Sequence, residues 1–291
     1  MISFAAYSMV YGFIEILAQP VIHVFGPGTI LYVDGFFKYE QLISHFLAAA
    51  YCASFGLCIS LLSVHFVYRY IAVCSSQNLT YLEGRNLWKA YAFPLVISVL
   101  WFLNNGYFCG PSLLKTDFFK KSISEEYNEN LHRLGYISFL YFYTDSYGNR
   151  YPNWIDFIGC SYDCGIMQIS TVIMVYCGWK TYRQMTIGTR TMSAKTKELN
   201  CQLFKTLVIQ TIIPLFFMFI PVGSVIFLPI FSVPISSAVS NATSLYEALY
   251  PGIDATIIIC MLRDFRNTVF CRNRVRQSKS SGLAGNNNNA I

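Results

Sequence analysis

Arg69 is the first residue of this sequence whose type and setting suggest chemistry. It lies in the segment VHFVYRY (residues 64–70), at the end of a long apolar stretch. An arginine beside aromatic rings either anchors a helix by reaching the membrane surface or turns toward a bound partner. The same stretch carries several serines and a histidine, which is typical of a central helix and favours the partner contact. Tyr68, Arg69 and Tyr70 are therefore a candidate switch.

A proline and an acid in the last apolar stretch, Pro251 and Asp254, form a second candidate. Proline bends a helix because it frees a carbonyl from its hydrogen bond. A carboxylate within a membrane is costly unless it faces the bundle interior or water. The two residues could act as a switch in the last helix. The alternative is a plain helix-end carboxylate balanced by Arg263.

Five polar residues lie toward the ends of the apolar stretches that are opposite to Arg69, and they could line a binding cavity. Polar groups at that depth usually face a cavity, although they can also bond to one another across helices as structural contacts. Glu15, in the first apolar stretch, presents the same choice. The candidate pocket consists of Asn104, Asn105, Asp163, Tyr246 and Glu247.

The sequence carries no enzyme signature. Its four histidines do not stand at metal-ligand spacing, and it has neither a GxSxG motif nor a Gly-rich loop between a strand and a helix. We therefore expect no catalytic residue, no metal and no cofactor. The ten cysteines are not a disulfide framework, because several lie inside apolar stretches. Cys109 could still pair with Cys160 or Cys164.

Membrane helices must position these residues, because the composition excludes an ordinary soluble domain. The chain is 54% hydrophobic and 12% charged, whereas soluble domains are about 25% charged. Its apolar blocks are too long and too free of charge for half-exposed elements. The 21 Lys and Arg residues cluster at the edges of these blocks, so the net charge of +6 indicates membrane topology rather than nucleic-acid binding.

Six stretches could cross the hydrocarbon core, which needs about 20 apolar residues. The last two are separated near Pro229 and Pro234, because an uncharged run of 41 residues exceeds one span. We expect an all-α, polytopic transmembrane bundle over residues 1–264. The six predicted spans are Ser3–Phe25, Leu42–Cys74, Ala90–Cys109, Phe157–Trp179, Thr206–Leu228 and Ser237–Leu262.

The basic residues divide unequally between the two sides of this bundle. Fifteen lie in the second-to-third turn, the fourth-to-fifth turn and the tail, and six lie on the other side, which includes a long loop at about 110–156. The positive-inside rule then places the C-terminus in the cytosol and the long loop outside. The Ser, Gly and Asn content of residues 265–291 predicts a disordered cytoplasmic tail.

Three segments together resemble the nematode seven-transmembrane chemoreceptors of the str family. They are QPVIH (19–23), HFVYRY (65–70) and YPGID (250–254) followed by RDFR (263–266). The resemblance covers nearly the whole chain. It implies a G-protein-coupled receptor that binds a small odorant or pheromone, contacts a heterotrimeric G protein and lies in the plasma membrane, with the sensory cilium of a chemosensory neuron as a candidate location.

The chain departs from the family pattern at two places. In the family Pro20 and His23 belong to the end of the second helix, so we expect the first of seven helices to be missing here. The family usually has a proline after the aspartate, where this chain has Ala255. Two other classes of function stay open: a transporter or channel, which would be expected to show broken helices in matching halves or rings of charge, and a truncated receptor remnant that does not signal.

Overall fold

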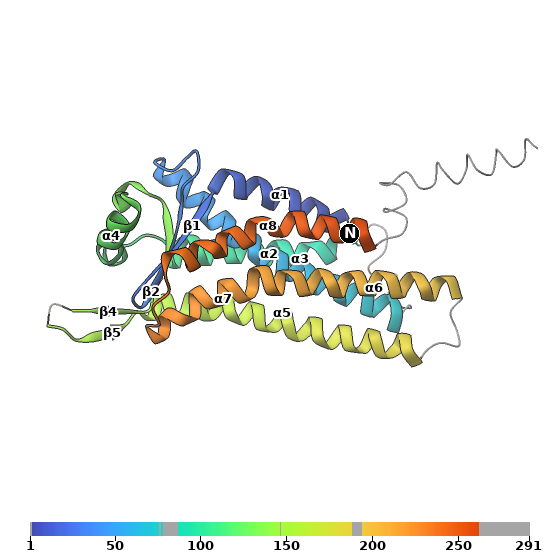
Figure 1. The fold of residues 1–291 in the computed structure, drawn as a ribbon. Coiled ribbons are helices and arrows are strands. Elements are labelled where there is room, and N and C mark those ends of the chain that lie inside the picture. Colours follow the sequence, from blue (N-terminus) through green and yellow to red (C-terminus); the bar gives the residue numbers. More distant parts are fainter. Residues whose placement is uncertain (1, 76, 78–86, 146, 188–193, 262–291) are drawn as a thin grey trace, which may run out of the picture.

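A computed structural model describes residues 2–75, 77, 87–145, 147–187 and 194–261 of the chain. Within these ranges the molecule is an elongated bundle of helices with a small mixed region at one end (Figure 1). The predicted disordered tail at 265–291 lies outside the described residues, and so does Arg263, the proposed counter-charge of Asp254.

The long helices run back and forth along the molecule (Figure 1). They confirm the predicted helical membrane bundle. Three of them, Gln41–Cys74, Trp154–Thr186 and Asn200–Phe231, are long and apolar enough to cross a membrane; Trp88–Phe108 with Leu113–Tyr127 would be a fourth span, bent by 82°. The helices are α1 (Ile2–Ala18), α2 (Gln41–Cys74), α3 (Leu87–Leu103), α4 (Leu113–Tyr127), α5 (Trp154–Ile187), α6 (Ala194–Pro214), α7 (Ile220–Phe227) and α8 (Ser237–Met261).

The first predicted span, Ser3–Phe25, is wrong over residues 19–25, because α1 ends at Ala18. Gln19 takes a positive φ of 43°, and Pro20 begins a strand, β1 (Pro20–Phe25). Proline has no N–H to continue a helix and disfavours the helical conformation in the residue before it. The β-branched residues that follow favour a strand. Pro20 and His23 therefore lie in a strand, not at the end of a helix.

The described residues of the stretch predicted as one long loop, at about 110–156, include a helix and three strands. β1, β2 (Gly28–Val33) and β3 (Tyr136–Leu140) form an antiparallel sheet in that order. Helix α4 packs on this sheet through buried Phe119 and Ile123, and a hairpin of β4 (Phe142–Thr144) and β5 (Arg150–Pro152) projects beyond it (Figure 1). We call residues 20–33 and 110–153 the cap. The cap adds a small sheet to the predicted all-α architecture.

The opposite end of the bundle is the end at which α2 and α5 finish and α3 and α6 begin (Figure 1). We call it the basic end, because it carries Arg69, Lys89, Lys180, Arg183 and Lys205. The N-terminal end of α1 and the last described turn of α8 also lie here. The cap and the basic end are therefore the two faces between which the helices alternate.

Helices α6 and α7 form one interrupted path across the bundle. A π-helical turn, Leu215–Phe219, joins them, and a 3-10 turn, Leu228–Phe231, follows α7. Prolines 214 and 221 remove backbone donors on either side of the π-helical turn, which accounts for the irregular hydrogen bonding. The gap between the end of α7 and the start of α8 lies at the predicted boundary near Pro229 and Pro234.

Helix α2 is the centre of the bundle, packed against α1, α3 and α5. Gly56 allows close approach of α3, because a Cβ there would lie 2.6 Å from the Trp101 ring. The serines of α2 are hydrogen-bonded inside the protein: Ser60 Oγ donates to Gly56 O at 2.7 Å, and Ser63 Oγ donates to Ser170 O of α5 at 3.2 Å. This placement agrees with the central helix expected from the polar residues of the segment.

Candidate functional site

A cavity of about 90 Å³ lies among the helices on the side of the cap. Its walls are mainly apolar and aromatic, and a few polar groups interrupt them. This combination is typical of small-molecule binding sites. The cavity is lined by Ile22, Thr29, Leu31, Tyr51, Cys52, Phe55, Trp101, Asn105, Ile137, Phe139, Asp163, Met167, Val222, Val225, Ile226 and Glu247.

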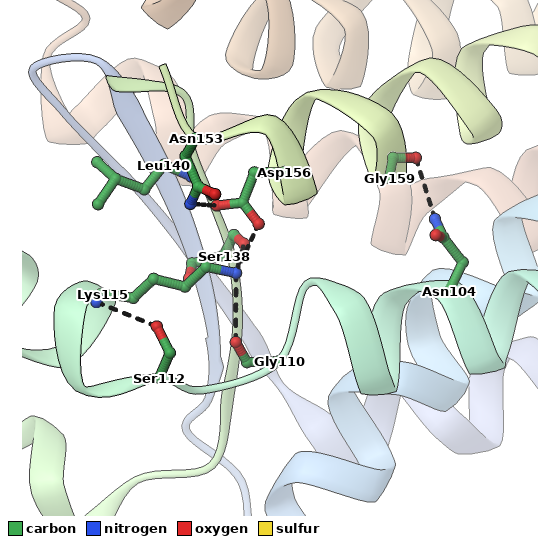
Figure 2. A network of polar contacts seen from close by, with 9 residues as sticks. All are labelled: Asn104, Gly110, Ser112, Lys115, Ser138, Leu140, Asn153, Asp156 and Gly159. Carbon is green, nitrogen blue, oxygen red and sulfur yellow. Dashed lines mark hydrogen bonds and ion pairs between the residues drawn. The ribbon is translucent and has the colours of Figure 1, made fainter. Parts of the chain in front are cut away.

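Asp163 of α5 is held on both of its carboxylate oxygens. Asn104 Nδ2 donates to Oδ1 at 3.0 Å, and Asn105 Nδ2 donates to Oδ2 at 2.9 Å. Asn104 Nδ2 also lies 3.0 Å from the carbonyl oxygen of Gly159 (Figure 2). Asn105 and Asp163 line the cavity, whereas Asn104 does not. The cluster therefore combines the two roles expected from the sequence, because it forms part of the cavity wall and also makes hydrogen bonds between helices.

Glu247 of α8 lies in a different setting. It is 3% exposed and lines the cavity, and the hydroxyl of Tyr51 donates to its Oε2. Its Oε1 is buried and has no hydrogen-bond partner among the described residues. The neighbouring Tyr246 is 45% exposed, packs edge-on against Phe217 and does not line the cavity.

The cap closes one side of the cavity with residues of all three strands of its sheet. Two hydrogen bonds join the cap to the last turn of α7. Thr29 Oγ1 donates to Val225 O, and the Tyr141 hydroxyl donates to Ile226 O at 3.0 Å. Because both acceptors belong to residues that line the cavity, a displacement of α7 would also disturb the cap.

A buried ion pair fixes the cap to the start of α5. Lys115 Nζ lies 2.7 Å from Asp156 Oδ1, and the two side chains are 4% and 0% exposed. Lys115 Nζ also donates to the carbonyl oxygens of Gly110 and Ser138, and Asp156 Oδ2 accepts from Leu140 N and Asn153 Nδ2 (Figure 2). A buried pair survives when such additional bonds satisfy its remaining donors and acceptors.

His23 of β1 connects the sheet to α4. Its Nε2 lies 2.6 Å from Ser122 Oγ, and its Nδ1 lies 3.4 Å from the hydroxyl of Tyr127, which accepts from Asn241 of α8. Burial lowers the pKa of His23 below its ordinary value of 6.5, and the nearby Glu126 charge opposes this only in part. The imidazole is therefore neutral at pH 7, and the contact joins sheet, α4 and α8.

A second cavity, of about 250 Å³, lies at the basic end. Tyr68 and Arg69 line it, together with residues of α3 and α6 that include Leu207 and Gln210. Arg69 is partly buried. Tyr70 does not line this cavity, and its ring lies 6.3 Å from that of Tyr176 on α5. The structure therefore places two of the three predicted switch residues at one cavity and the third at the α2–α5 contact.

Asp254 is buried and accepts a hydrogen bond from Gln210 Nε2 of α6 at 3.0 Å. Its second oxygen, Oδ2, has no partner within the described part of the chain. Pro251 lies inside α8, which continues as a helix to Met261. Gln210 also lines the cavity of Arg69. Its side chain therefore contacts the last-helix switch at Asp254 and borders the cavity of the other switch, at Tyr68 and Arg69.

Cys109, Cys160 and Cys164 are free thiols in the structure. Cys160 and Cys164 lie on one face of α5 with their sulfurs 3.9 Å apart, and the hydroxyl of Tyr141 donates to Cys160. Cys109 faces Gly159 of α5, where a Cβ would lie 2.8 Å from its sulfur.

Several residues of these sites escape sequence reasoning. Tyr51 and Gln210 lie in apolar stretches with no local motif, and their partners, Glu247 and Asp254, belong to another helix. Lys115 resembles the exposed lysines near it, and Asp156 lies 41 residues further along the chain. No spacing pattern connects such a pair.

Comparisons with known proteins identify the family. A model of the serpentine type 7TM GPCR chemoreceptor Str family matches residues 1–270. The chain is 33% identical to serpentine receptor class r-10 of Caenorhabditis briggsae and 32% identical to serpentine receptor class r-10 of Caenorhabditis elegans, in each case over 97% of this chain and 84% of the relative.

A more distant relative is G-protein coupled receptor str-33 of C. elegans, with 25% identity over 91% of this chain and 77% of the relative. These relatives are receptors, so the expectation that the chain is not an enzyme is confirmed by its family. The residues that suggested the resemblance belong to the matched region. The chain is a member of the Str family of serpentine seven-transmembrane G-protein-coupled chemoreceptors.

Proposed function

We propose that this receptor binds a small odorant or pheromone in the cavity on the cap side and signals to a heterotrimeric G protein at the basic end. The observation that carries the proposal is the cavity itself, which combines apolar and aromatic walls with the polar groups of Tyr51, Asn105, Asp163 and Glu247. The lining residues come from five helices of the bundle, α2, α3, α5, α7 and α8. A ligand there would contact the elements whose relative packing has to change during signalling.

The orientation in the membrane is part of the proposal. The basic end would lie in the cytosol and the cap outside, because lysines and arginines are in excess on cytosolic faces. The C-terminus would then be cytosolic, and the receptor would lie in the plasma membrane, with the sensory cilium as its site in a neuron. An epitope inserted at Asn128 should be reached by antibody in intact cells, and one at Ser280 only after permeabilisation. Shielding of the Asn128 epitope would contradict the orientation.

The path from ligand to partner would run through α8. Glu247, at the ligand cavity, and Asp254, bonded to Gln210, lie seven residues apart on this helix, which places them on one face two turns apart. A shift of α8 around Pro251 would change the Asp254–Gln210 contact and with it the cavity of Tyr68 and Arg69. A ligand drives this change only if it binds one packing more tightly than the other.

The test fills the cavity. Val222→Phe adds bulk at a lining residue, and Val239→Phe adds the same bulk at a residue of α8 that is 60% exposed. Both variants are expressed in cells with a G-protein-coupled calcium reporter, and surface delivery is measured with an extracellular tag. We expect Val222→Phe to lose the responses of the unchanged receptor to small volatile compounds, and Val239→Phe to retain them. Equal responses from the two variants would contradict the proposed binding site.

A further inference from the structure

The two acids that line the ligand cavity differ in how far their oxygens are satisfied. Both oxygens of Asp163 accept bonds from asparagine side chains at 2.9–3.0 Å. Glu247 accepts one bond, from Tyr51, while its Oε1 is buried without a partner among the described residues. A buried carboxylate oxygen without a donor is costly. One of the two acids that line the cavity therefore carries a buried acceptor that no donor of the described residues satisfies.

Within the part of the chain that the structure describes, no cationic side chain lines this cavity. Its lining residues, given above, include no lysine, arginine or histidine. The donors nearby are neutral: the Tyr51 hydroxyl and the two asparagine amides. A neutral donor does not balance a carboxylate charge in a low-dielectric interior, whereas a cation held in contact does.

The remaining walls suit a cation with a short apolar part. Tyr51, Phe55, Trp101 and Phe139 contribute aromatic rings to the lining. Ring faces attract ammonium groups, and the attraction grows when water is excluded. Aliphatic residues such as Val222 and Ile226 complete the wall. The cavity volume of about 90 Å³ is smaller than the roughly 150 Å³ of an engineered protein cavity that binds benzene, so the occupant has only a few non-hydrogen atoms.

We infer that the ligand is a small alkylammonium ion, whose charged group contacts Glu247 Oε1 while its alkyl part lies against the aromatic wall. This inference rests on the proposed function, since it names the chemical class of ligand for that same cavity. Glu247 acts as the counter-ion, and Tyr51 holds its other oxygen in place. Asp163 is already satisfied and keeps α3 and α5 together.

The probe is n-propylammonium. It is compared with two molecules of similar size, neutral 1-propanol and negatively charged propionate. The full chain, with confirmed surface delivery, is assayed with the calcium reporter, and the purified receptor is assayed by ligand-induced change in melting temperature, which needs no signalling. We expect n-propylammonium to activate and stabilise the receptor, and propionate to do neither. The variants are Glu247→Gln, Glu247→Asp and the control Glu125→Gln, which removes an exposed carboxylate of α4.

Glu247→Gln should weaken the effect of n-propylammonium at least about 30-fold, because truncating one partner of a buried charged contact costs that much or more. Glu247→Asp should recover part of the effect, and Glu125→Gln should leave it unchanged. An unchanged n-propylammonium effect in Glu247→Gln would overturn the inference, because Glu247 would then be a neutral structural group. Responses to neutral compounds alone would overturn it as well and leave the proposed function standing. A surface-delivered receptor that no small molecule activates or stabilises would overturn both.

Discussion

The cap end and the basic end differ in how their cationic side chains are held. At the cap end, Lys115 is buried and paired with Asp156, and Lys38 contacts Asp34 and Glu129. At the basic end, Arg69 borders a cavity of about 250 Å³, and the described residues that line it include no acid. Every ion pair between described residues belongs to the cap end. One end of the bundle is held in a single arrangement, and the other has a cation next to open space.

This difference shows where the receptor can change shape. A buried, fully bonded ion pair has one favourable geometry, and leaving it costs desolvation that nothing repays. A partly buried arginine beside a cavity can move with little loss of packing. We therefore expect ligand-dependent rearrangement to be small at the cap and larger at the basic end. The following predictions test that contrast.

The largest effect should come from breaking the cap pair. Lys115→Met leaves Asp156 buried without its cation, which we expect to lower the free energy of unfolding by about 3–5 kcal/mol. The melting temperature of the purified receptor and its surface delivery should both fall. The matched control is Lys121→Met on the same helix, whose ammonium is exposed and 3.8 Å from Glu125. If both variants melt alike, the cap is not held by the buried pair.

At the basic end, Arg69→Ala should separate signalling from stability. We expect surface delivery to persist while ligand-evoked signalling falls about 5–150-fold, the range of a coupling free energy of about 1–3 kcal/mol. Lys89→Ala, which removes an exposed cation at the same end, should keep both. Parallel loss of delivery and signal in Arg69→Ala would instead support a membrane anchor.

A smaller effect should follow acidification, through His23 of the cap. Its pKa is lowered by burial, so below about pH 6.5 the unfolded chain binds more protons than the folded one. The stabilising contribution of neutral His23 is complete at pH 7.5 and is lost as the pH falls through this region. We expect a modest fall in melting temperature from pH 7.5 to 5.5, reduced in His23→Gln. An identical pH profile in that variant would show that other groups cause the fall.

The smallest effect should be at Tyr246. Its ring is 45% exposed on the outside of α8 and does not line the ligand cavity. Tyr246→Leu should leave ligand response and melting temperature nearly unchanged, although the next residue is Glu247. A response lost to the same extent as in a Glu247 variant would mean that α8 is rotated relative to the structure.

The sequence contains enough to predict the bundle, because a span is a local property. Apolar runs, prolines and basic flanks locate both ends of α2 and α8 within one residue, whereas α5 begins three residues before its predicted span and ends eight residues after it. The cap could not be predicted in this way. The sequence of strand β1 predicts the end of a membrane helix, because its apolar residues satisfy a hydropathy window as well as a strand pattern. Its partner β2 depends in turn on β3, more than 100 residues later.

The candidate site was partly visible for the same reason. Isolated acids such as Asp163 and Glu247 stand out against an apolar background, and both line the cavity. The number of hydrogen bonds that each carboxylate accepts depends on donors from other helices. Asn104 and Asn105 donate to Asp163, and Tyr51 donates to Glu247. Helix rotation decides those contacts, and one sequence does not specify it. The same limit separates Glu247 from the exposed Tyr246 beside it.

The central position of α2 also has a consequence for how the receptor is made. Ser63 Oγ donates to the carbonyl oxygen of Ser170, 107 residues later, and the ring nitrogens of His45 lie 2.9 and 3.1 Å from the carbonyl oxygens of Gly106 and Tyr136, 61 and 91 residues later. At synthesis rates of about 5–20 residues per second, these partners leave the ribosome several seconds after α2. During that interval the polar groups of a helix designed for the centre of the bundle face lipid or the insertion machinery. Surface yield should therefore depend on how long translation pauses before α5, even when the finished receptor is equally stable.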